Sequence, residues 1–353
     1  MVVIDGSHGE GGGQILRTGL TLAALTEQPV RVERIRAGRK NPGLRPQHLT
    51  AVRAAAAVCQ ARLEGDALGS QTLSFLPGGP ARPGEYTFDV AKVARGGSAG
   101  SVGLVLQTVL LPLALAGGES RLVLRGGTHV PWAPSVSYLE HVFLPTMTRM
   151  GLHAAEVELA RWGFYPAGGG EVRVQIAGRS GELAAISLIE RGELERIWGM
   201  AVVTNLPAHI SQRMAARAQN VLAESELRAE VEPRRLRGTG PGAGIFLFAE
   251  YAHALAGFTA YGRKGLPAER VAETACNELL AHHRTGKPAD PHLSDQLVLP
   301  MALATGESQV VTSQVTRHLL TNVWVVRQFL DRELNVEGEP GMPGTLLVKG
   351  GGV

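Results

Sequence analysis

Apolar and polar positions follow the same order three times along the chain. A turn rich in glycine or aspartate precedes an apolar run of helical period, then come a strand pattern and a second helix pattern. The first helix patterns read GGQILRTGLTLAALT, AGSVGLVLQTVLLPLALA and HLSDQLVLPMALA. Two further strand-like pieces tend to close each copy. We therefore expect three copies of a unit with two helices and a four-stranded sheet, over roughly residues 1–90, 91–180 and 285–353.

Residues 182–284 break this repeat. They carry strand patterns at RIWGMAVVTNL, LRAEVEP, GIFLFAEYA and AGFTAYGR, with helix patterns at ISQRMAARAQNVLA and AERVAETACNELLAHHR. This order predicts a compact α+β insert. The fold class is therefore α+β, with a large three-repeat domain over 1–181 and 285–353 and a small inserted α+β domain over 182–284.

The composition adds limits on compartment and partners. A chain of 353 residues with 44% hydrophobic residues can bury a sizeable core, and its net charge of +3 does not by itself indicate a nucleic-acid partner. Two cysteines, Cys59 and Cys276, predict buried thiols in a reducing compartment rather than a disulfide framework. The apolar stretch around Gln107 and Pro112 predicts a buried helix. With no signal-peptide pattern at the start, we expect a soluble cytoplasmic protein.

A glycine-rich segment near the start, HGEGGGQILR, favours an anion site. It is not a P-loop, because no Lys-Ser/Thr pair follows, and Gln14 stands where a dinucleotide fingerprint has its third glycine. Gly11, Gly12 and Gly13 lead into a helix start, whose free amides and dipole attract negative charge. Glu10 would repel a phosphate unless a divalent metal lay between them. The alternative is a tight turn with Glu10 as an ordinary acid at a helix start.

Basic residues cluster next in the chain. The loop RAGRKNPGLRPQH joins a strand to a helix and is rich in donors for phosphate oxygens, although a solvated surface explains it equally well. Two histidines, His292 and His318, stand at helix starts. A lone histidine is more often structural than chemical. The chain has no HExxH or HxH pattern, which argues against a zinc site.

Taken together, DGSHGEGGGQILRTGLTL, RAGRKNPGLRPQHLTAV, GSVGLVLQTVLLPLAL, GFYPAGGGEV, HLSDQLVLPMALA and RHLLTNV closely resemble the RNA 3′-terminal phosphate cyclase family. The resemblance runs in order along nearly the whole chain and is weakest in the insert. It implies a three-repeat large domain related to the enolpyruvyl transferases, plus a small inserted α+β domain. It also implies ATP, a divalent metal (Mg²⁺ or Mn²⁺) and an RNA substrate that ends in a 3′-phosphate.

The resemblance implies a reaction in three steps. A histidine attacks the α-phosphorus of ATP and becomes a phosphoramidate of AMP. The AMP passes to the RNA 3′-phosphate to give an RNA-pp-A end. The neighbouring 2′-hydroxyl then expels AMP and leaves a 2′,3′-cyclic phosphate. No membrane and no obligate protein partner are expected.

The resemblance also implies roles for particular residues. The nucleophile of the family lies in the segment that reads RHLLTN here, which makes His318 the carrier, and Glu10 matches the metal-contacting glutamate. The implied nucleotide contacts are Arg17, Gln107, Pro131, Tyr138, His292, Leu293, Ser294, Asp295 and Gln296. The implied contacts to the RNA 3′-phosphate are Arg36, Arg39, Gln47 and His48. His292 departs from the family pattern, which has tyrosine there, so a stacking or hydroxyl contact is in doubt.

Two other functions fit the same fold. A non-catalytic relative that acts in ribosome assembly would lack the nucleophilic histidine, whereas His318 is present. An enolpyruvyl transferase would need no covalent nucleotide and would respond to phosphoenolpyruvate.

Overall fold

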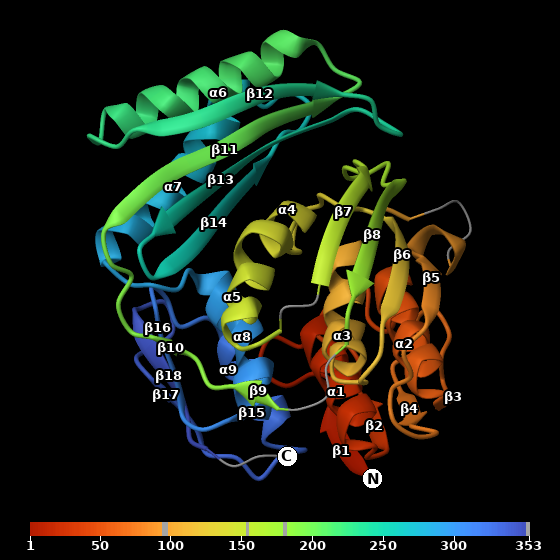
Figure 1. Cartoon of the computed structure of the whole chain (residues 1–353). Coiled ribbons are helices and arrows are strands. Elements are labelled where there is room, and N and C mark those ends of the chain that lie inside the picture. Colours follow the sequence, from red (N-terminus) through yellow and green to blue (C-terminus); the bar gives the residue numbers. More distant parts are fainter. Residues whose placement is uncertain (94–97, 153–154, 179–181, 351–353) are drawn as a thin grey trace.

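Three four-stranded sheets with the same strand order carry the repeated units (Figure 1). The computed structural model describes residues 1–93, 98–152, 155–178 and 182–350. The first unit contains β1 (Val2–Asp5), α1 (Gly13–Thr26), β2 (Val30–Glu33), α2 (Pro46–Cys59), β3 (Arg62–Glu64) and β4 (Leu73–Leu76). Its strand order is β1-β2-β4-β3, with β1 and β2 parallel and the other two pairs antiparallel.

The second unit repeats this order as β5-β6-β8-β7. It contains β5 (Glu85–Asp89), a 3₁₀ turn (Val90–Val93), α3 (Val102–Ala114), β6 (Ser120–Gly126), α4 (Val136–Tyr138), a π-helical turn (Leu139–Phe143), α5 (Leu144–Arg149), β7 (Ala155–Arg161) and β8 (Gly170–Ile176). The expected limit between the first two copies, near residue 90, is wrong. Strand β5 pairs in parallel with β6 and so opens the second unit. Residues 94–97, part of the glycine-rich turn expected before α3, lie outside the described residues.

The third unit has the order β10-β16-β18-β17. It contains β10 (Ser187–Leu188), α8 (Pro291–Leu303), β16 (Ser308–Thr312), α9 (Arg317–Val326), β17 (Leu334–Glu337) and β18 (Gly344–Val348). A small pair, β9 (Leu183–Ala184) and β15 (Ala304–Thr305), lies beside it. The expected third copy began at residue 285, but its first strand, β10, precedes the insert and pairs with β16. A strand of two residues is too short to show a two-residue period in the sequence.

The insert enters between the first strand and the first helix of the third unit. It contains β11 (Leu194–Thr204), α6 (Ala208–Ala223), β12 (Ala229–Leu236), β13 (Gly242–Tyr251), β14 (Ala254–Tyr261) and α7 (Ala268–Thr285). Every strand and helix expected there is found, in a sheet of order β12-β11-β13-β14. Helices α6 and α7 cover its outer face around a core of its own, and the opposite face turns toward the repeated units (Figure 1).

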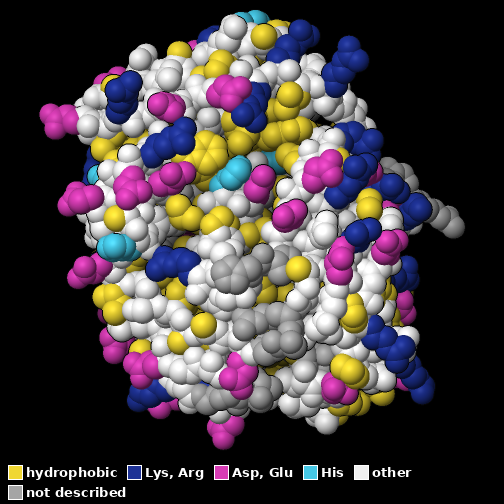
Figure 2. Space-filling view, in the orientation of Figure 1, with side chains coloured by type: hydrophobic (Ala, Val, Ile, Leu, Met, Phe, Trp, Pro, Cys, Tyr) yellow, Lys and Arg dark blue, Asp and Glu magenta, His cyan; other side chains and the backbone are white. Residues whose placement is uncertain are grey.

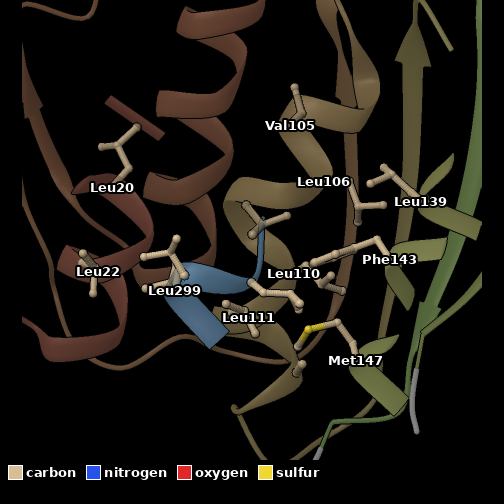
Figure 3. Close-up of a cluster of buried hydrophobic side chains, with 14 of the residues drawn as sticks. Leu20, Leu22, Val105, Leu106, Leu110, Leu111, Leu139, Phe143, Met147 and Leu299 are labelled. Atoms are coloured by element: carbon tan, nitrogen blue, oxygen red, sulfur yellow. The ribbon is translucent and has the colours of Figure 1, made fainter. Parts of the chain in front are cut away.

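The main core lies where the helices of the three units meet. Leu20 and Leu22 of α1, Leu110 of α3, Phe143 of the π-helical turn and Leu299 of α8 gather in one cluster (Figure 3). The apolar stretch around Pro112 forms the buried helix α3, as expected, and both cysteines are buried free thiols. Within the described ranges, no helix is long and apolar enough to cross a membrane. The α+β class, with three repeated units and an inserted α+β unit, is confirmed.

Candidate active site

The glycine loop before α1 meets the start of α9, and this contact joins the first and third units. His318 is the second residue of α9, and its Nδ1 lies 2.7 Å from Glu10 Oε2. Gly9 has a positive φ of 57°, and a Cβ there would lie 2.7 Å from the Thr321 hydroxyl. Only glycine permits both this backbone conformation and this close approach. The glycine pattern therefore brings Glu10 against the histidine.

The surroundings of His318 favour its neutral form. Burial lowers the pKa of His318, Glu10 raises it, and the charges of Arg17, His292 and Arg39 lower it, with a net downward shift. Because Nδ1 faces the Glu10 carboxylate, the proton of the neutral ring belongs on Nδ1, and Nε2 carries the free electron pair. The side chain is 49% exposed, so a substrate can reach Nε2.

Cationic side chains gather over the N-terminus of α1. A Cβ on Gly13 would collide with His48 Nε2 and lie 3.0 Å from Arg17 Nη1, and one on Gly12 would lie 3.4 Å from Arg39 Nη2. Burial lowers the pKa of Arg17 to about 10, which still leaves it charged at neutral pH. Among the described residues, the Arg17 guanidinium has no carboxylate partner. Unpaired positive charge beside free helix amides is suited to a phosphate.

His48 serves this cluster as a neutral group. Burial, followed by the charges of Arg17, Arg36 and Arg45, lowers the pKa of His48 to about 3. Its Nδ1 accepts a hydrogen bond of 3.1 Å from the Arg45 amide, so a proton on Nε2 would point toward the α1 N-terminus. The histidine can thus donate to an anion there without adding charge.

Arg36 and Gln47 form hydrogen bonds to backbone groups of the protein in this structure. Arg36 Nη1 donates to the carbonyls of Asn41 at 2.6 Å and Gly43 at 3.0 Å, and so fixes the basic loop. Gln47 Oε1 accepts from the amide of Ser101, the N-cap residue of α3, at 3.1 Å. Gln47 thereby connects the first unit to the second. Of the basic pair expected at the RNA end, Arg39 is the one closest to Glu10, with 3.8 Å between Nη2 and Oε2.

Two of the residues expected to contact the nucleotide connect α3 to α8. Gln107 Nε2 donates to Gln296 Oε1 at 2.6 Å, and Gln296 Nε2 donates to the His292 carbonyl at 2.9 Å. His292 is exposed at the start of α8. Pro131 is half-buried in the segment that precedes α4. All four residues keep some exposure to solvent, and Gln107, Gln296 and His292 lie together.

The other members of that group point into the protein. Leu293 and Ser294 are fully buried, and Asp295 is 6% exposed. Asp295 accepts a hydrogen bond from Thr316, and burial raises its pKa well above the usual range. The buried Asn322 donates to the Asp295 carbonyl at 2.8 Å. The Asp295 side chain therefore anchors the start of α9 rather than facing solvent.

Tyr138 is likewise buried and engaged. Its hydroxyl donates to both oxygens of Asp290 at 2.9 Å, and burial together with Asp290 raises its pKa. The Asp290 carboxylate also accepts from the amides of His292 at 2.8 Å, Leu293 at 2.9 Å and Gly257 at 3.2 Å. One carboxylate thus ties the second unit, the third unit and the insert together. Asp290 was not anticipated, although an aspartate before proline at a helix start is a typical N-cap signal.

Gln14 is a second residue that the sequence analysis missed. Its Nε2 donates to the His318 carbonyl at 3.4 Å, while its Oε1 is buried without a hydrogen-bond partner among the residues that the structure describes. An unsatisfied buried acceptor is costly, so it is suited to a donor that arrives with a ligand. Its sequence signal was only its place after the glycines.

The donors present fit a metal that shares its ligands with a substrate. No group of three or more His, Cys, Asp or Glu side chains able to hold a metal occurs within the part of the chain that the structure describes. Glu10 binds His318 through Oε2, which leaves Oε1 for another partner. Mg²⁺ is commonly held by one or two carboxylates, waters and substrate phosphates. Glu10 alone can supply the protein's share.

The fold consists of three units of one topology with an α+β insert. Its site is suited to bind an anionic group at the start of α1, beside the imidazole of His318. The family model described as RNA 3′-terminal phosphate cyclase matches residues 8–336. The chain belongs to the RNA 3′-terminal phosphate cyclase family.

Relatives named RNA 3′-terminal phosphate cyclase match along most of their length. The protein of Nostoc punctiforme is 56% identical over 93% of this chain and 94% of its own. That of Methylococcus capsulatus is 57% identical over 92% and 90%, and that of Thermococcus kodakarensis 43% identical over 98% of each chain. The solved structure of the enolpyruvyl transferase NikO from Streptomyces tendae matches at 12% identity and a TM-score of 0.40, over 100% of this chain and 49% of that one.

Proposed function

We propose that this protein uses ATP to convert an RNA 3′-phosphate into a 2′,3′-cyclic phosphate, with His318 as the carrier of AMP. The observation that supports this role is the 2.7 Å contact between His318 Nδ1 and Glu10 Oε2, which directs the free electron pair of Nε2 outward. Membership of the family supports the overall activity.

In the first step, His318 Nε2 attacks the α-phosphorus of ATP. A nitrogen–phosphorus bond forms, the bond to the bridging oxygen breaks, and pyrophosphate leaves. The ring now carries positive charge, which the adjacent Glu10 carboxylate stabilises through Nδ1. Arg17 and the N-terminus of α1 offer positive charge to the departing phosphates.

In the second step, a 3′-phosphate oxygen of the RNA attacks the phosphorus of the bound AMP. The nitrogen–phosphorus bond breaks, His318 is restored, and the RNA ends in pp-A. In the third step, the vicinal 2′-hydroxyl attacks the 3′-phosphorus, loses its proton to solvent and expels AMP. Arg39 Nη2 lies 3.8 Å from Glu10 Oε2, so Arg39 can meet an RNA phosphate beside the carboxylate.

Glu10 Oε1 is the group that would hold a divalent metal, Mg²⁺ or Mn²⁺. When bound, such an ion would neutralise phosphate charge during nucleotidyl transfer. The cytoplasmic location and the absence of an obligate protein partner stay predictions.

Incubation of the protein with ATP labelled at the α-phosphate tests this proposal. We expect acid-labile, alkali-stable label on the wild-type protein and none on His318→Asn, which keeps a polar side chain at the helix start. A second reaction with RNA ending in 3′-phosphate should release AMP and yield a cyclic end. A protein that retains no label but turns over phosphoenolpyruvate would be an enolpyruvyl transferase. A protein that does neither would be a non-catalytic relative, and both results would overturn the proposal.

A further inference from the structure

Two large aromatic side chains project into solvent beside the insert. Trp132 is 91% exposed and Tyr165 is 57% exposed, and their rings meet edge to face with centroids 6.4 Å apart. The other three tryptophans, Trp162, Trp198 and Trp324, are at least partly buried. An exposed aromatic pair of this size leaves a large apolar area in water, and such areas commonly mark binding sites.

The backbone holds the Trp132 indole outward. Trp132 has a φ of 62°, a left-handed conformation that is strained for a bulky residue. The chain is anchored on both sides of Trp132. Val130 is buried two residues earlier, and Ser135 caps α4 through the Tyr138 amide at 3.0 Å. A strained backbone conformation that exposes a large indole indicates that the indole binds a partner.

The loop that carries Tyr165 packs against one end of the insert. The Thr239 hydroxyl donates to the Gly169 carbonyl at 3.0 Å, and a Cβ on Gly240 would lie 2.5 Å from the Ala167 side chain. The Phe164 ring meets the edge of Tyr261, the last residue of β14, at 6.4 Å. The aromatic pair therefore lies next to the end of the insert sheet where β11, β12 and β14 finish.

That end of the insert carries unpaired positive charge. Arg237 follows β12, and Arg263 and Lys264 follow β14; all three side chains are exposed. None of the three has an ion-pair partner among the residues that the structure describes. Lys and Arg side chains gather at the right of Figure 2, where the insert approaches β7 and β8.

We propose that the pair Trp132–Tyr165, together with Arg237, Arg263 and Lys264, binds the nucleotides of the RNA substrate that precede its 3′ end. Bases of single-stranded RNA stack on exposed aromatic rings, and their phosphates bind nearby cations without sequence preference. This combination fits RNA better than a protein partner, because an apolar protein surface would leave the three charges unpaired. The inference rests on the proposed function and assigns the insert a share in holding the substrate.

Ring and charge contacts connect the segment after Trp132 to the surroundings of His318. Trp132 precedes α4, where Tyr138 meets the His292 ring at 6.3 Å, and the charge of His292 acts on His318.

Binding of fluorescently labelled oligoribonucleotides tests the strip independently of catalysis. Trp132→Ala should weaken binding of a 12-nucleotide RNA by about tenfold, the scale of losing one stacked base. Trp132→Phe, which keeps a stacking face, should restore most of it. A 3′-phosphorylated dinucleotide, which has only one nucleotide before its 3′ end, should be less sensitive to Trp132→Ala than the 12-nucleotide RNA.

Arg228 offers a matched control for the charges. It is exposed and unpaired among the described residues, and it precedes β12 at the opposite end of the strand from Arg237. Arg237→Ala should reduce both RNA affinity and its salt dependence, whereas Arg228→Ala should change neither. Equal effects of the two variants would overturn the assignment of the charged end.

Labelling by ATP alone separates this inference from other outcomes. Trp132→Ala should form the labelled protein with unchanged ATP dependence. A raised ATP requirement would place the indole on the adenine instead and overturn the proposal, as would unchanged affinity for long RNA. Failure of the wild-type protein to label would refute the proposed function, while its RNA binding could still be measured.

Discussion

Replacement of Glu10 by glutamine isolates the charge of the carboxylate from its hydrogen bond. The amide oxygen of Glu10→Gln can still accept from His318 Nδ1, so the ring orientation and the proton on Nδ1 are kept. What disappears is the negative charge that stabilises the positive ring of the AMP-bearing histidine. Glu10→Ala removes the hydrogen bond as well. The two variants therefore distinguish the electrostatic from the positioning contribution.

The expected loss of labelling rate in Glu10→Gln follows from the exposure of the Glu10 and His318 side chains. A hydrogen bond to a charged group contributes about 1.5–3 kcal/mol and one between neutral groups about 1 kcal/mol, so loss of the charge alone costs about 0.5–2 kcal/mol. The two side chains are 27% and 49% exposed, so screening by water favours the lower limit. A loss of about 0.5–1 kcal/mol slows labelling by about two- to fivefold. Loss of the metal contact would bring the total to about 10²-fold at low metal concentration.

The pH dependence gives a second, independent readout. Glu10 raises the pKa of His318, whereas burial and the charges of Arg17, His292 and Arg39 lower it. Without Glu10, only the lowering causes remain, so the pKa of His318 falls further. Since only the neutral ring attacks, the acid limb of the labelling rate should move to lower pH in Glu10→Gln.

The assay is the initial rate of protein labelling by α-labelled ATP, over a series of metal concentrations and pH values. Glu27→Gln, at the opposite end of α1 and exposed, is the control and should behave like the wild type. Full labelling by Glu10→Gln at limiting metal, with an unshifted acid limb, would refute both roles of Glu10.

Three further predictions concern the nucleophile, the basic loop and acid stability. His318→Ala should abolish labelling by ATP. The same variant should retain some cyclisation of RNA that already ends in pp-A, measured by product chromatography. Label retained by His318→Ala would show that another residue is the nucleophile. Arg39→Ala should slow AMP transfer to RNA more than labelling, whereas Arg36→Ala, which frees two loop carbonyls, should impair both steps in single-turnover assays. His48 and His129 each have a pKa near 3 because of burial, against about 6.5 when unfolded. Their contribution to stability is complete above pH 6.5 and falls toward pH 3 by roughly 3 kcal/mol per pH unit, measurable by urea unfolding.

The strongly periodic parts of the fold could be predicted from the sequence. The stretch that became α3 is apolar on every face and flanked by glycines, and the strands of the insert are long enough to show their period. Strand β10 has two residues and gave no signal, so the start of the third unit was misplaced. Strand β5 was assigned to the wrong copy because hydrogen-bond partners far apart in the chain leave no trace in local periodicity.

The site was predictable in part, and for a related reason. Glycines and helix starts indicated an anion site, but the contact between Glu10 and His318 joins residues 308 positions apart, and only the family resemblance connected them. The burial of Leu293, Ser294 and Asp295 was not foreseen. Helix α8 is enclosed on most of its surface, so hydrophobic periodicity could not tell which side chains face the substrate.

Each of the three repeated units contributes different side chains to the site. The first unit contributes Glu10 and Arg17, the second contributes Gln107, and the third contributes His318. These groups meet where α1 contacts α3 and α9 and where Gln107 reaches Gln296 of α8. A fragment that holds one or two units can therefore keep its sheet and still lack a complete reaction centre. Activity in a chain severed between units should return only when the pieces reassemble, so reconstitution from fragments would report docking of the units and not their individual folding.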